Sequence, residues 1–215
     1  MRRHDFIYVC PAAWRSLVTA HNDLAIEPLV VRWVDRGWPL ISRRALPGEG
    51  QGIALGLPLP PIAGKKRLSA MMQPTDIIAI ASPPSISLAR KAAPLSWRPT
   101  LDRICALAEK RNVDARVFGS LAWQALTDLE YVTETSDIDL LLRFDIGTDI
   151  AGVIASIADI ERSAPMRIDG EAVRHDGAAV NWRELHAGSR VVLVKAASGV
   201  ALLEASRFLS GQVAA

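Results

Sequence analysis

Cysteine is scarce in this chain of 215 residues, which has only Cys10 and Cys105. Two thiols so far apart provide neither a disulfide scaffold nor the close spacing of a zinc cluster, so we expect free thiols in a reducing compartment. Net charge is also small, at +2, which argues against a nucleic-acid-binding tract or an acidic tail. No apolar run is long enough to span a bilayer, and the run that follows Asp5 is broken at Pro11, unlike a signal peptide. We therefore expect a cytoplasmic protein with no nucleic-acid or membrane partner.

Half of the sequence is apolar, which is enough to bury a core. The composition changes along the chain, because eleven of the thirteen prolines precede Pro99. We predict an α+β protein with a Pro-rich, mainly β domain at residues 1–97 and a catalytic domain at residues 98–215. In the first domain, the sequence favours strands at 6–9, 28–33, 38–44 and 53–57, with a short helix at 11–18.

The second domain shows alternating helical and strand patterns. Asp176-Gly177 is typical of a tight hairpin, and Thr100 is the expected N-cap of the first helix. These signals predict a mixed sheet packed on helices. The predicted helices are 100–110, the segment after Gly119-Ser120, 148–163 and 199–209, and the predicted strands are 115–118, 137–144, 166–173, 178–182 and 190–194.

A Gly-Ser turn and two aspartates stand out in this domain. Asp137 and Asp139 are two residues apart in a predicted strand, so their side chains leave the same face about 7 Å apart. Paired carboxylates repel each other unless a cation lies between them, and hard oxygen ligands suit Mg²⁺ or Mn²⁺. Gly119-Ser120 opens a helix, whose first N–H groups can bind an anion. A phosphate site beside a carboxylate pair indicates metal-assisted phosphoryl or nucleotidyl transfer; the alternative is turn chemistry with solvated carboxylates.

A two-metal centre needs a third acid from a neighbouring strand. Asp169 and Glu171 share one face of the predicted strand 166–173, and either can fill this role. We favour Asp169 because it precedes Gly170, where another backbone can approach closely. In the competing interpretation both acids are charges on an edge strand, where they prevent a hairpin from pairing with other strands.

A basic cluster in the first domain, Lys65, Lys66 and Arg67, is a candidate for binding a polyphosphate. It follows a rigid proline turn and a flexible glycine, Gly64, which would let the three cations close over a ligand. A solvated surface is the alternative for this cluster. Lys195 is expected to be a surface lysine.

The Gly-Ser turn followed by Asp-x-Asp on the next strand resembles the nucleotidyltransferase superfamily, although the gap from Ser120 to Asp137 is longer than usual. More of the chain resembles the phosphoribosyl-dephospho-CoA transferases of malonate decarboxylase, its holo-acyl-carrier-protein synthases, and the long gap agrees with that family. The segments that carry this resemblance are Arg3–Asp5, Gly56–Pro58 with Lys66–Arg67, Gly119–Gln124, Thr135–Leu141, Asp169–Glu171 and Val180–Leu185.

This resemblance implies that the enzyme takes 2′-(5″-triphosphoribosyl)-3′-dephospho-CoA as donor. The acceptor would be a serine of the acyl-carrier subunit of malonate decarboxylase, and pyrophosphate would leave. Mg²⁺ would be held by Asp137, Asp139 and Asp169, while Gly119 and Ser120 grip the terminal phosphates. Two other hypotheses remain at this point: a generic nucleotidyltransferase that acts on another acceptor, and a non-catalytic nucleotide-binding adaptor of the same fold.

Overall fold

A computed structural model describes residues 1–21, 27–196 and 199–210. The chain divides into two compact units, a first unit at Met1–Pro83 and a second at Pro84–Ala215. The proline pattern placed the boundary further along, between residues 97 and 98. The difference arises because the short helix α4 (Ile86–Ala89) packs against α5 (Arg98–Arg111) and α6 (Gly119–Thr127), and so belongs to the second unit.

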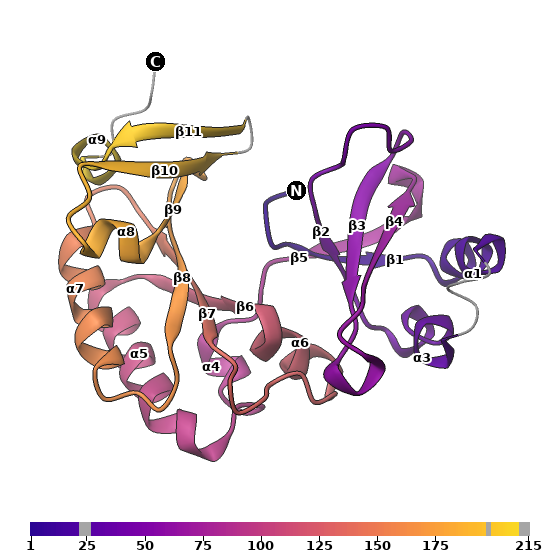
Figure 1. Cartoon of the computed structure of the whole chain (residues 1–215), viewed down its shortest axis with the longest axis horizontal. Coiled ribbons are helices and arrows are strands. Elements are labelled where there is room, and N and C mark those ends of the chain that lie inside the picture. Colours follow the sequence, from indigo (N-terminus) through magenta and orange to yellow (C-terminus); the bar gives the residue numbers. More distant parts are fainter. Residues whose placement is uncertain (22–26, 197–198, 211–215) are drawn as a thin grey trace. The chain divides into compact units, whose positions relative to one another are not determined.

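The first unit contains an antiparallel sheet of five strands in the order β4-β3-β2-β1-β5 (Figure 1). Apolar side chains from the sheet and from α1 are fully buried, among them Phe6, Trp14 and Leu55. This agrees with the predicted small, mainly β domain. Its elements are β1 (Phe6–Val9), α1 (Pro11–Ala20), α3 (Pro28–Val31), a 3-10 turn (Val34–Arg36), β2 (Leu40–Ser42), β3 (Ile53–Pro58), a 3-10 turn (Pro61–Ala63), β4 (Arg67–Met72), a 3-10 turn (Pro74–Asp76) and β5 (Ile77–Ala81).

The second unit contains a six-stranded sheet in the order β11-β10-β9-β8-β7-β6. β7 and β8 are parallel and the other pairs are antiparallel, so the sheet is mixed, as predicted. The remaining elements of this unit are a 3-10 turn (Leu95–Trp97), β6 (Asp114–Phe118), β7 (Ile138–Phe144), α7 (Ile150–Glu161), β8 (Ile168–Arg174), β9 (Ala179–Asn181), α8 (Trp182–His186), β10 (Val191–Ala196), β11 (Gly199–Glu204) and α9 (Ala205–Leu209).

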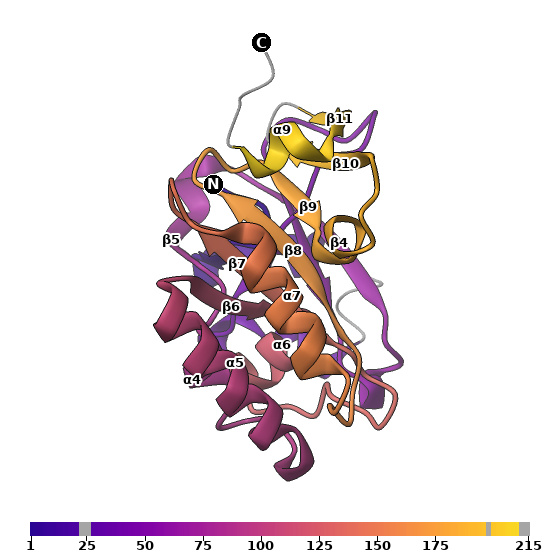
Figure 2. The same cartoon turned by 90° about the vertical axis from the view of Figure 1, so that its left-hand side faces the viewer.

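Helices α5 and α7 lie side by side against one face of this sheet (Figure 2). Along β7, Ile138, Leu140 and Leu142 are at most 1% exposed, whereas Asp139 and Arg143 on the opposite face are only partly buried. The alternation follows from the period of two in a strand. One face therefore carries the core of the second unit, and the other presents polar side chains.

Several element predictions were wrong. Residues 28–33 do not form a strand: Pro28 begins the short helix α3, and the Trp14 indole donates to the Val30 carbonyl at 2.9 Å. The segment 199–209 is not one helix, because its first half pairs with β10 as β11 and only Ala205–Leu209 is helical. Thr100 is not an N-cap, since α5 begins two residues earlier and buries it.

Among the described stretches of the chain, no helix has the length and apolar character that crossing a membrane requires.

Candidate active site

The Gly-Ser turn contacts one of the two aspartates directly. Strand β6 ends at Phe118, and Gly119 turns the chain into α6 with a positive φ of 63°. A Cβ added at Gly119 would overlap the Asp139 carboxylate. Only glycine combines this conformation with so close an approach. The start of α6 and the Asp139 side chain therefore lie close together.

Parallel pairing brings the third acid to the same place. Asp139 of β7 lies opposite Asp169 of β8, and Asp137 immediately precedes β7. Residues opposite each other in neighbouring strands point to the same face. Gly170 permits this register, because a Cβ there would overlap the Leu140 carbonyl of β7. The three predicted acids thus lie together on the polar face of the sheet.

Crowded carboxylates make the site strongly negative. Burial, followed by the nearby charges of Asp169, Asp137 and Glu171, raises the pKa of Asp139 from 3.8 to about 6. Loss of solvent and repulsion between like charges both disfavour the ionised carboxylate. A bound cation would relieve both effects.

An exposed arginine that the sequence analysis did not single out spans two of these acids. The Arg167 guanidinium lies 3.9 Å from Asp137 Oδ2 and 3.7 Å from Asp169 Oδ2. Its backbone carbonyl accepts a hydrogen bond from Ile138 N at 3.0 Å, which ties the start of β7 to the segment before β8. Arg167 becomes a neighbour of Asp137 only through the parallel pairing of two strands far apart in sequence.

Glu171, the alternative third acid, has a different environment. It is 5% exposed, and the Lys195 ammonium donates to its Oε1 at 2.9 Å. Lys195 is therefore the ion-pair partner of a buried acid, not a simple surface lysine. Glu171 is therefore paired with an ammonium group within the fold, whereas Asp169 lies directly opposite Asp139.

The long segment between Ser120 and Asp137 is fixed by one side chain of α6. Gln124 Oε1 accepts hydrogen bonds from the backbone N–H groups of Tyr131 and Val132 at 3.0 and 2.9 Å, and its Nε2 donates to the Ala92 carbonyl at 2.7 Å. Tyr131 packs on the Trp123 ring with 6.0 Å between centroids. Gln124, to which the sequence analysis assigned no role, thus anchors the loop that leads into the aspartates.

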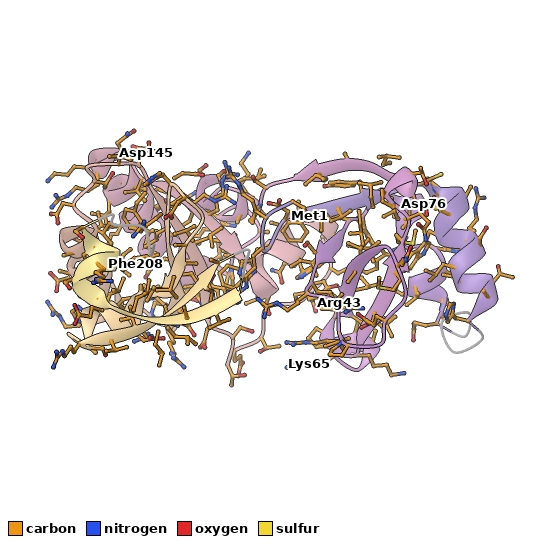
Figure 3. The ribbon with its side chains drawn as sticks, turned by 90° about the horizontal axis from the view of Figure 1, so that it is seen from above. Met1, Arg43, Lys65, Asp76, Asp145 and Phe208 are labelled. Carbon is orange, nitrogen blue, oxygen red and sulfur yellow. The ribbon has the colours of Figure 1, made fainter. Side chains whose placement is uncertain are left out.

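The basic cluster lies in the first unit: Lys65 (labelled in Figure 3) and Lys66 are on the connection between β3 and β4, and Arg67 begins β4. Lys65, Lys66 and Arg67 are all exposed, and Lys65 has a φ of 53°. The Lys66 carbonyl accepts from Leu59 N at 2.8 Å, which closes the hairpin. The cluster is accessible to an anionic ligand.

The acids of the second unit have the oxygen donors that Mg²⁺ or Mn²⁺ prefers, although within the described residues no group of three His, Cys, Asp or Glu side chains is arranged to hold a metal ion. Asp137, Asp139 and Asp169 supply only oxygen ligands, the preferred donors of both ions. Burial, and then the charges of Asp169, Asp137 and Glu171, raise the pKa of Asp139, and a cation bound beside it would favour its ionised form. The donor set therefore fits a divalent cation.

Comparison with known proteins identifies the family. Residues 85–206 match the phosphoribosyl-dephospho-CoA transferase MdcG C-terminal domain, and residues 2–83 match the N-terminal domain of the same enzyme. The chain belongs to the phosphoribosyl-dephospho-CoA transferase family. Its members are named as enzymes, so the family confirms both the predicted resemblance and the prediction of a transferase.

Relatives in this family match over nearly their whole length. A phosphoribosyl-dephospho-CoA transferase of Bradyrhizobium diazoefficiens is 53% identical over 97% of this chain and 92% of its own. One from Xanthomonas axonopodis pv. citri is 32% identical over 99% of both chains, and one from Pseudomonas putida is 30% identical over 94% of this chain and 93% of its own. No solved structure matches the chain.

Proposed function

We propose that this phosphoribosyl-dephospho-CoA transferase loads the acyl-carrier subunit of malonate decarboxylase. The donor is 2′-(5″-triphosphoribosyl)-3′-dephospho-CoA, and the acceptor is a serine hydroxyl. A new bond joins the serine oxygen to the phosphorus next to the ribose, the bond from that phosphorus to pyrophosphate breaks, and the serine proton is released. The observation that carries the proposal is the contact of the Gly119 turn with an acidic cluster, in a chain of this family.

The residues of the site have distinct roles in this proposal. Asp137, Asp139 and Asp169 hold Mg²⁺, which when bound supplies charge stabilisation at the transferred and departing phosphates. Gly119 N–H and the Ser120 hydroxyl bind the terminal phosphates at the start of α6. Arg167, which lies beside two of the acids, balances their charge before the donor binds.

Lys65, Lys66 and Arg67 are assigned to the remaining phosphates of the donor. Their exposure and triple positive charge support that role. Lys195 is left out of the phosphate site, because its ammonium is engaged by Glu171.

The test is a loading assay read by intact mass. We expect purified protein, Mg²⁺, the triphosphoribosyl donor and apo carrier to give a carrier whose mass increases by one prosthetic group on its serine, with release of pyrophosphate. Asp137→Ala should remain folded and give no increase. Transfer from ATP at a rate equal to that from the triphosphoribosyl donor would instead indicate a generic nucleotidyltransferase. Donor binding without any transfer would indicate an adaptor.

A further inference from the structure

The two oxygens of the Asp169 side chain have different partners. Its Oδ1 accepts hydrogen bonds from Gly170 N at 2.8 Å and from Asn181 Nδ2 of β9 at 3.0 Å. Its Oδ2 lies on the side of Arg167, 3.7 Å from the guanidinium. Oδ1 is thus fixed by two short hydrogen bonds, whereas Oδ2 has a longer contact with the exposed Arg167 side chain, which a bound cation could displace.

The orientation of the Asn181 amide is fixed independently of Asp169. Asn181 is the N-cap of α8, and its Oδ1 accepts from Arg183 N at 2.9 Å. An amide has one acceptor oxygen and one donor nitrogen. Because the oxygen is occupied by the helix, the NH₂ group must face Asp169.

The backbone before Asp169 is held by a second pair of side chains. Glu161 of α7 accepts from Ile168 N at 2.7 Å, and Arg183 of α8 donates to the Ile168 carbonyl at 2.7 Å. Arg183 and Glu161 also form an ion pair, and the Arg183 guanidinium stacks over the Trp182 ring at 4.7 Å. The main chain and the side chain of this acid are therefore both fixed from α8.

The two acids of β8 are treated differently by their neighbours. Glu171 Oε1 accepts from the Lys195 ammonium at 2.9 Å, whereas Asp169 Oδ1 accepts from the neutral Asn181 amide at 3.0 Å and Asp169 Oδ2 lies 3.7 Å from the exposed Arg167 guanidinium. A neutral amide on one carboxylate oxygen is the kind of neighbour that orients a metal ligand.

We propose that Asn181 is a positioning residue, which orients the Asp169 carboxylate so that Oδ2 faces the divalent cation. This inference rests on the metal site of the proposed function, but not on the identity of donor or acceptor. Neighbours that orient metal ligands typically contribute about 10- to 100-fold to affinity or activity.

The test compares Mn²⁺ binding to the full chain, by titration calorimetry or by the electron paramagnetic resonance of free Mn²⁺. Asn181→Ser keeps a good N-cap residue but removes the amide donor. We expect it to weaken Mn²⁺ binding about tenfold and to lower kcat by a similar factor. Asp149→Ser is the matched control, because Asp149 caps α7 through Gly152 N and lies outside the acidic cluster; it should leave the Mn²⁺ affinity unchanged.

A double-variant cycle separates positioning from a general loss of structure. If Asn181 acts through Asp169, Asn181→Ser should have no further effect on Mn²⁺ affinity when Asp169→Ala is already present. Two results would overturn the proposal: Mn²⁺ affinity of Asn181→Ser within twofold of the parent, or an equal tenfold loss in the Asp169→Ala background. A protein that binds Mn²⁺ as expected but fails to load the carrier would contradict the proposed function alone.

Discussion

Gly119 holds a backbone conformation that side chains rarely adopt, and the space that a Cβ would need is filled by Asp139. One small residue thereby sets the spacing between the proposed phosphate site and the acids that flank it. The structure offers a comparison at Gly177, whose φ of 85° is similarly strained but whose surroundings are open. A substitution at Gly177 therefore tests the effect of the positive φ alone, whereas a substitution at Gly119 adds steric overlap with Asp139.

Gly119→Ala is expected to lower the free energy of unfolding by roughly 2–4 kcal/mol, since it adds overpacking to the strain of a positive φ. It should also displace Asp139 and reduce transfer about a hundredfold. Gly177→Ala should cost only about 1 kcal/mol and leave transfer unchanged. Chemical denaturation and the loading assay measure both effects, and equal behaviour of the two variants would refute the steric argument.

The charge of Asp139 predicts a pH dependence in the absence of divalent cations. Because the folded-state pKa of about 6 exceeds the ordinary value of 3.8, this carboxyl favours folding below about pH 4, and that contribution is lost as pH rises through 6. Asp139→Asn stays neutral throughout. The free energy of unfolding of Asp139→Asn, minus that of the parent, should therefore increase by about 2–3 kcal/mol between pH 4 and 7.

Thermal or urea unfolding in the presence of a chelator checks this prediction. Asp145→Asn, at a solvent-exposed acid (Figure 3), is the control and should show no such growth with pH. A stability difference between Asp139→Asn and the parent that stays constant from pH 4 to 8 would contradict the crowding of charges at this site.

Among the elements, the loop between α6 and β7 determines how the chain enters the acidic pair. Its residues 128–137 have no regular secondary structure, and Gln124 provides three of the hydrogen bonds that hold them and α6 in place. Thr133 and Ser136 add a local turn, in which Thr133 N donates to Ser136 Oγ at 2.9 Å. The order of this loop therefore depends strongly on one amide.

Gln124→Ala should speed hydrogen exchange at the Tyr131 and Val132 amides, whose acceptor it removes, and lower the free energy of unfolding by about 1–3 kcal/mol. The matched control is Gln73→Ala, which removes a capping glutamine in the first unit. Unchanged exchange at these two amides in Gln124→Ala would show that the loop is held by other contacts.

The sequence predicted the elements whose patterns are set locally and missed those decided by distant partners. Strands β6, β7 and β8 and the Gly-Ser turn follow from apolar alternation and special backbone positions. Residues 199–204 were read as helix because Val200, Leu202 and Leu203 fit either period; pairing with β10 decides between them.

The same distinction applies to the site. Asp137, Asp139 and Asp169 were predicted from the period of two, whereas Arg167 and Asn181 become neighbours of these acids only through pairings across β7, β8 and β9. Asn181 did carry one readable signal, since asparagine before Trp182-Arg183-Glu184 is typical of a helix N-cap.

At the scale of the whole molecule, the candidate functions are divided between the two units. The acids and the Gly-Ser turn belong to the second unit, and Lys65, Lys66 and Arg67 belong to the first. Each unit has its own sheet and its own buried core. Metal binding and donor binding should therefore be separable by substitution.

Replacing Lys65, Lys66 and Arg67 together by alanine is expected to raise the KM for the triphosphoribosyl donor by about tenfold or more, because three charge-assisted phosphate contacts are lost. Mn²⁺ affinity and the unfolding midpoint should not change, since all three side chains are exposed. A KM that stays within twofold of the parent would remove this cluster from the donor site.

The central claim is that Asp137, Asp139 and Asp169 together bind a divalent cation beside the Gly119 turn. Anomalous diffraction from crystals grown with Mn²⁺ tests it most directly. The account predicts an anomalous peak at about 2.0–2.3 Å from carboxylate oxygens of these three residues. Absence of this anomalous peak from crystals of Asp139→Asn would support the assignment. A peak elsewhere, for example on Glu171 in place of Lys195, or no peak in the parent at saturating Mn²⁺, would contradict it.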